Sequence, residues 1–230
     1  MKLIKLAAAA VLALSSISAS AGLISVVDSG SSSYAPNIPA FSNNNFTAPG
    51  YVTPSSYTIA GSLKANAKLA VTYYFLGQES NWENIFSVPG DAEAGLNKTN
   101  KGTITTYVEK DALFDFLFTT VVPPTSVLPG HNLSVTNAQG STLGTNNRVY
   151  SFAVALNAYF SGQGPNAKAA HAGNYDAILF LDDTGPHAGD DDNHDDLLIG
   201  VRVTDVPEPT TLLLMSMGLL GLFGARRLKA

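Results

Sequence analysis

Residues 151–156 read Ser-Phe-Ala-Val-Ala-Leu, and this stretch decides the fold class. The larger side chains, Phe152, Val154 and Leu156, fall on every second position. Side chains of a β-strand point alternately to the two faces of a sheet, so a period of two residues predicts a strand with one face against a core.

Similar short runs, rich in β-branched and aromatic residues and separated by turn formers, recur along the chain. We predict strands at residues 57–63, 67–76, 104–108, 113–122, 133–136, 148–160, 175–181 and 197–203, with a further one at 23–27. Residues 29–56 are rich in Ser, Asn, Pro and Gly and predict a long irregular segment. The pattern favours an all-β protein with one β-sandwich domain, jelly-roll-like, over residues 22–205.

The first 21 residues have the three parts of a secretory signal peptide. Lys2 and Lys5 form a positive beginning, residues 6–14 are apolar, and Ala19-Ser20-Ala21 fits a cleavage site before Gly22. A buried N-terminal helix would carry polar residues on one face, and residues 6–14 have none. We therefore expect a signal helix, export by the Sec machinery, and a mature chain that begins at Gly22.

The C-terminal segment predicts a membrane anchor. Residues 210–225 carry no charge and correspond to about 24 Å of helix, short of a bilayer core of ~30 Å, but counting from Val206 gives a span of 20 residues. Basic residues follow at once, and they favour a cytoplasmic location for that end. We therefore expect a C-terminal transmembrane helix within residues 206–230.

The residues around this apolar span carry a family resemblance. Val206-Pro207-Glu208-Pro209 precedes the span and Arg226-Arg227 ends it, and this three-part order resembles the PEP-CTERM protein-sorting signal. The resemblance implies recognition and processing of the tail by an exosortase in the membrane. The same tail is also described as the C-terminal domain of certain ice-binding proteins, and ice binding is a third interpretation that rests on this description alone.

Composition and charge exclude several classes of protein. The chain has no cysteine, which excludes disulfide scaffolds and Cys-ligated zinc sites. Residues 22–205 contain 17 Asp and Glu against 8 Lys and Arg, a formal charge of 8 − 17 = −9. A field of this sign repels phosphate, so we expect no nucleic-acid partner.

The sharpest chemical feature is an acidic loop between two predicted strands. Asp182 and Asp183 end the first strand, and Asp195 and Asp196 open the second, so antiparallel pairing would bring these four carboxylates together. Like charges about 4 Å apart repel by ~4 kcal/mol at an effective dielectric near 20. No Lys or Arg lies within 177–201, so a Ca²⁺ ion is one way to neutralise the loop.

The predicted calcium ligands are Asp182, Asp183, Asp190, Asp191, Asp192, Asn193, Asp195 and Asp196. The loop is no EF-hand, because Asp196 replaces the turn glycine and Arg202 stands where the bidentate Glu belongs. A solvated acidic loop without metal is an equally good interpretation. His187 and His194 leave a zinc site open as a weaker alternative.

The sequence offers little for catalysis. It contains no Gly-x-Ser-x-Gly, no His-Glu-x-x-His, no Walker loop and no Gly-x-Gly-x-x-Gly after a predicted strand. Trp82, the only tryptophan, lies beside Glu83 and Asn84 and is a weak candidate for stacking on a sugar, although a single tryptophan is more often a core residue.

We therefore expect a non-catalytic protein, exported, anchored transiently in the inner membrane and then displayed at the cell surface or in the extracellular matrix. It would act in the biofilm, associated with exopolysaccharide, and bind glycan through an edge stabilised by Ca²⁺. The alternative is a secreted polysaccharide hydrolase or lyase, since such enzymes need only two suitably spaced carboxylates.

Overall fold

The structure is a computed structural model of the 230-residue chain. It describes residues 22–28, 50–53, 56–59, 61–80, 82–91, 95–121, 132–139, 141–143, 149–183, 195–207 and 215–218. The predicted signal peptide, residues 1–21, lies outside these described residues.

An eight-stranded antiparallel sheet dominates the described part of the chain. In spatial order its main path is β10 (Ser141–Leu143), β11 (Val149–Phe160), β12 (Gly173–Asp182), β13 (Leu197–Asp205), β5 (Leu69–Gly77) and β7 (Thr103–Val108). Two short strands, β2 (Val52–Thr53) and β3 (Ser56–Ile59), pair with β11 as well, along the edge that β10 also occupies. The long edge of β11 is thereby covered, which protects it from pairing with another chain.

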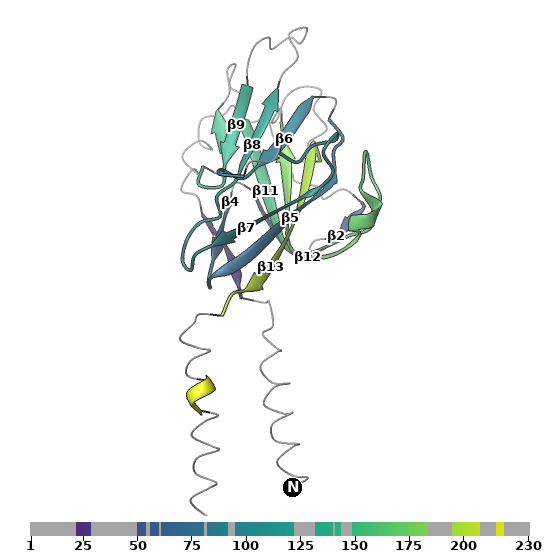
Figure 1. Cartoon of the computed structure of the whole chain (residues 1–230). Coiled ribbons are helices and arrows are strands. Elements are labelled where there is room, and N and C mark those ends of the chain that lie inside the picture. Colours follow the sequence, from purple (N-terminus) through teal and green to yellow (C-terminus); the bar gives the residue numbers. More distant parts are fainter. Residues whose placement is uncertain are drawn as a thin grey trace, which may run out of the picture.

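Two smaller antiparallel sheets complete the described strands. One contains β6 (Glu83–Ser87), β8 (Leu117–Val121) and β9 (Asn132–Thr136), and the other pairs β1 (Ile24–Asp28) with β4 (Gly61–Ala65). β6 contacts β13, and β9 contacts β10 and β11, so the three-stranded sheet lies against the large one. In Figure 1, β6, β8 and β9 lie toward the end of the body opposite to the end of β13.

Aromatic rings fill the space between the sheets. Phe86 of β6 lies 4.8 Å from Tyr73 of β5 and 5.3 Å from Phe118 of β8, measured between ring centroids. Phe118 in turn lies 5.7 Å from Phe152 of β11. All four rings are fully buried. The larger side chains of the 151–156 stretch do face this core, because Phe152 and Val154 belong to the same cluster and Leu156 packs against it.

A second apolar cluster lies on the opposite face of the large sheet. It includes Ala155, Ile178, Phe180 and Leu198, and it is closed by residues of the 160–167 region and by Tyr51. Strand β12 is therefore buried on both faces, from Ala177 to Asp182. This double burial explains why its sequence is a continuous apolar run without alternation.

The all-β prediction is confirmed, with differences in detail. The run predicted at 57–63 is split between β3 in the large sheet and β4 in a small one. At the crossing, a Cβ on Gly61 would lie 2.4 Å from Cγ1 of Val26, so only glycine fits there. Strand β6 was not predicted, because Glu83–Ser87 is short and half polar. Strands β10 to β13 form a meander of consecutive neighbours, whereas a jelly roll is built from Greek keys.

Of the predicted C-terminal membrane helix, only residues 215–218 are described, and they are helical. Within the described ranges, no helix has both the length and the apolar character needed to span a membrane.

Candidate functional site

The base of the β12–β13 hairpin brings the predicted acidic residues together. Leu181 pairs with Leu197, so the residues that follow β12 and precede β13 meet at one end of the sheet. There the backbone N–H of Asp183 donates a hydrogen bond of 2.8 Å to Oδ2 of Asp196. Asp182, Asp183 and Asp195 are only 2–4% exposed, so the hairpin base is a buried polar cluster.

Neutral donors from distant segments bind these carboxylates. Oδ2 of Asp183 accepts hydrogen bonds from Oγ of Ser80 at 2.8 Å and from Nδ2 of Asn84 at 2.7 Å. Oδ2 of Asp195 accepts a hydrogen bond from the hydroxyl of Tyr51. Donors of this kind favour the charged form of a carboxylate as a cation would, although more weakly. They offer a way to accommodate the repulsion that the sequence indicated.

Asn84 connects the acidic cluster to the core between the sheets. Its Oδ1 accepts a hydrogen bond of 2.5 Å from Oγ1 of Thr120 on β8. The same Oγ1 of Thr120 lies 2.7 Å from the hydroxyl of Tyr150 on β11. Because Thr120 has a single hydroxyl proton and gives it to Asn84, the tyrosine donates to the threonine.

Tyr150 is held in its protonated form by its surroundings. Burial raises its pKa well above 10, and the negative charges of Asp183, Asp196 and Asp182 raise it further. The hydrogen bond with Thr120 opposes these effects but does not outweigh them. The neutral hydroxyl is thus available as a donor at all physiological pH values.

Four of the eight predicted calcium ligands lie outside the described residues. Asp190, Asp191, Asp192 and Asn193 lie there, as do His187 and His194 of the zinc alternative. Within the part of the chain that the structure describes, no group of three or more His, Cys, Asp or Glu residues is placed to hold a metal ion. Calcium binding therefore stays a prediction about the loop.

Trp82 immediately precedes β6 and is partly exposed. Its backbone carbonyl accepts hydrogen bonds from Nε2 of Gln78 at 2.8 Å and from Nζ of Lys98 at 3.4 Å. These contacts order the chain around the tryptophan through its backbone and leave the sugar-stacking role of its side chain a prediction.

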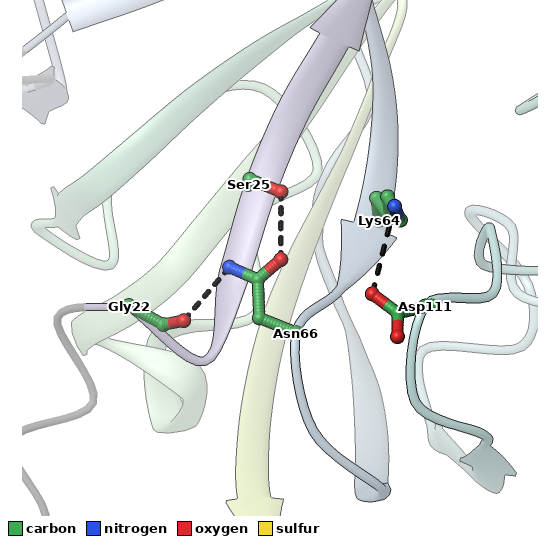
Figure 2. Close-up of polar contacts among 5 residues, drawn as sticks. All are labelled: Gly22, Ser25, Lys64, Asn66 and Asp111. Atoms are coloured by element: carbon green, nitrogen blue, oxygen red, sulfur yellow. Dashed lines mark hydrogen bonds and ion pairs between the residues drawn. The ribbon is translucent and has the colours of Figure 1, made fainter.

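One turn, residues 66–68, holds both ends of the β-body. Nδ2 of Asn66 donates to the carbonyl of Gly22 at 2.8 Å, and Oδ1 of Asn66 accepts from Oγ of Ser25 at 3.0 Å, as Figure 2 shows. The carbonyl of Lys68 accepts a hydrogen bond of 2.8 Å from the backbone N–H of Val206. The beginning of β1 and the sorting segment that follows β13 thus lie at the same end of the body, where Figure 1 shows β1 and the C-terminal end of β13.

The same end carries an ion pair, between Nζ of Lys64 and Oδ1 of Asp111 at 3.7 Å (Figure 2). Of the predicted sorting residues, Val206 and Pro207 are described, and they follow β13 without a gap. Glu208, Pro209, Arg226 and Arg227 lie outside the described residues.

The sequence did not single out the residues that bind the acidic cluster as partners of it. These residues are ordinary polar ones, and each is far in sequence from the carboxylate that it contacts. Asn84 is 99 positions and Ser80 is 103 positions from Asp183, and Tyr51 is 144 positions from Asp195. Only the closeness of Asn84 to the tryptophan drew attention to that stretch.

Comparison with known protein families identifies the C-terminal segment. Residues 205–227 match the family model described as the PEP-CTERM protein-sorting motif. No curated protein and no solved structure matches the chain. The chain carries a PEP-CTERM protein-sorting motif, which indicates an exported protein that is anchored transiently in the membrane and sorted by an exosortase to the cell surface.

Proposed function

We propose that the exported body is a non-catalytic β-sandwich that acts in the extracellular matrix by binding exopolysaccharide. The proposal that the body is not an enzyme is supported by the burial of its acidic residues at the base of the β12–β13 hairpin. A glycoside hydrolase needs two carboxylates that reach the glycosidic bond. Only 2–4% of the surface is exposed at Asp182, Asp183 and Asp195. Asp183 and Asp195 also accept hydrogen bonds from other residues of the fold, so these carboxylates are poorly placed to reach a bound sugar.

The sorting motif supports the location in this proposal. The motif indicates sorting to the cell surface, and the formal charge of −9 over residues 22–205 favours a body that stays in solution there. Its strand edges are partly covered by β2, β3 and β10, which keeps such a protein from aggregating at high local concentration.

The test uses the mature protein and the exopolysaccharide of the cells that make it. We expect the protein to sediment with the polysaccharide and to release no reducing ends during long incubation. Release of reducing ends that disappears in an Asp196→Asn variant would establish the hydrolase alternative instead. A mature protein that neither binds nor cleaves the polysaccharide would refute the proposal.

Calcium binding by the hairpin loop is a second part of this proposal. It is supported by the 7 acidic residues between 182 and 196 and by the lack of Lys or Arg within 177–201. An extracellular site of this kind needs an affinity on the order of 10⁻⁴–10⁻³ M. We expect millimolar CaCl₂, but not MgCl₂, to raise the melting temperature, and an Asp191→Asn, Asp192→Asn double variant to lose this response. An unchanged melting curve would remove calcium from the proposal.

A further inference from the structure

Among the described residues, one arginine, Arg202, lies on the face of the large sheet that is turned away from the core between the sheets. Strand β13 alternates, with Val201 and Val203 in the core between the sheets, so Arg202 points to the opposite face. Its strand neighbour is Thr72 of β5, which pairs with Thr105 of β7. The arginine is therefore part of a row of side chains that crosses three strands.

This part of the face is open. The alternate residues of β7 are all exposed: Thr103, Thr105 and Tyr107, the last of them 69% exposed. The hydroxyls of Thr72 and Thr105 lie 3.1 Å apart. The row thus offers hydroxyl groups beside an exposed aromatic side chain.

The guanidinium is held in place by aromatic rings. Its central carbon lies 4.5 Å from the ring centroid of Tyr175 and 5.0 Å from that of Tyr74. Nε donates a hydrogen bond of 3.1 Å to the carbonyl of Asn174. The rings are fixed in turn, because the Tyr175 hydroxyl donates to the carbonyl of His171 at 2.5 Å.

Two glycines leave room for this arrangement. A Cβ on Gly200 would lie 2.4 Å from Cε1 of Tyr175, so any other residue would displace the ring. A Cβ on Gly173 would lie 3.0 Å from Nη2 of Arg202, and Gly173 has a φ of +142°. The backbone of two strands is thus shaped around the ring and the guanidinium.

The guanidinium of Arg202 forms no ion pair with a described carboxylate. The closest acid along the strands is Asp176, whose Oδ2 instead accepts a hydrogen bond of 2.8 Å from the backbone N–H of Val203. Among the described residues the ion pairs are Lys64 with Asp111 and Lys68 with Glu109, and no described carboxylate lies within ion-pair distance of Arg202. This is notable in a body with more than twice as many acidic as basic residues. Nε is used by the fold, so the two terminal nitrogens keep their donors for a planar anion, the partner that arginine binds best.

We propose that Arg202, oriented by Tyr74 and Tyr175, binds the carboxylate of a uronic-acid residue in an acidic polysaccharide, whose neighbouring sugars lie over Thr72, Thr105 and Tyr107. This inference rests on the proposed function, because it names the class of glycan. One exposed carboxylate contact is weak alone, and a polymer that repeats the carboxylate along its length rebinds at high effective concentration. The formal charge of −9 over residues 22–205 opposes an acidic polymer at long range, so the local contacts at Arg202 must outweigh this repulsion.

The test measures binding of the full mature protein to polygalacturonate, with dextran as the neutral polymer. Arg202→Gln is expected to weaken polygalacturonate binding roughly tenfold or more, and Arg202→Lys to recover part of it, because a lysine keeps the charge but not the planar pair of donors. Lys68→Gln is the matched control, since it removes the same charge from a lysine that is ion-paired with Glu109. It is expected to leave binding unchanged.

The outcomes separate this inference from the proposed function. Equal binding by the wild type and the Arg202→Gln variant would overturn the inference, and so would binding to dextran alone, although the latter would leave the proposed glycan binding intact. If the wild type binds neither polymer, the inference is overturned, whereas the proposed function is refuted only by failure to bind the exopolysaccharide of the cells that make the protein. Should Arg202→Gln unfold, Tyr107→Ala removes an exposed ring without touching the packing of the arginine, and it is expected to weaken polygalacturonate binding several-fold.

Discussion

Two tyrosines in the core between the sheets are expected to respond oppositely to the same substitution. Tyr73 and Tyr150 are both almost completely buried. The hydroxyl of Tyr150 lies 2.7 Å from Oγ1 of Thr120, whereas the hydroxyl of Tyr73 has no hydrogen-bond partner among the described residues. Replacing either with phenylalanine removes one oxygen and keeps the ring, so the change isolates the hydrogen bond.

The magnitudes follow from the hydrogen bonds. Tyr150→Phe loses one bond and removes the donor to Thr120, which costs about 1–2 kcal/mol of unfolding free energy. Tyr73→Phe removes a buried hydroxyl that gains nothing from the fold, and it is expected to stabilise the protein by about 1 kcal/mol. For a domain of this size, each kcal/mol shifts the melting temperature by roughly 2–4 °C.

Urea unfolding of the mature protein at pH 7, followed by circular dichroism, measures both changes against the wild type. The m-values should agree among the three proteins, so that the midpoints report stability alone. If Tyr73→Phe destabilises the protein as much as Tyr150→Phe does, the Tyr73 hydroxyl must have a partner in solution, and the reasoning that separates the two residues is refuted.

Three further predictions concern other parts of the fold. Burial raises the pKa of Tyr175 to about 12 and that of Tyr73 higher still, whereas tyrosines in the unfolded chain titrate near 10. The unfolded chain therefore loses these protons first, and the melting temperature should fall as the pH rises from about 10 to 12. A melting temperature that does not change over this range would contradict the raised pKa values. Gly200→Ala should cost about 1–3 kcal/mol in urea unfolding and weaken polygalacturonate binding, because its Cβ would lie 2.4 Å from the Tyr175 ring; wild-type stability would show that the ring has room to move. Asn66→Ala should cost about 1–2 kcal/mol and speed amide exchange in β1, since Nδ2 of Asn66 bonds the Gly22 carbonyl at 2.8 Å; unchanged exchange would show that the strand pairing alone holds β1.

Local sequence was informative wherever a segment is decided by its own side chains. The alternation at 151–156 predicted a strand, and β11 covers it, because alternate residues face different clusters. The run at 57–63 failed as one strand because its break depends on the close approach of Val26, more than 30 positions away. Strand β6 escaped prediction because Glu83 and Asn84 make it look like a loop, and its strand conformation comes from pairing with β8.

The acidic hairpin shows the same division. Its position between two strands, and the approach of residues 183 and 196, followed from simple antiparallel pairing. The source of the compensating interactions did not. The sequence suggested a cation because the neighbouring positions lack Lys and Arg, whereas the structure brings Asn84, from 99 positions away, to Asp183.

The sequence by itself determined the sorting motif at 205–227 and the strand character of the body, since each of these is a property of a continuous stretch. Tertiary structure alone decided which polar groups meet: the amide that binds a buried aspartate, and the two tyrosine rings that orient Arg202. The physical reason is that hydrogen bonds and cation–π contacts act over a few ångströms, and sheet pairing between distant strands sets which residues come that close.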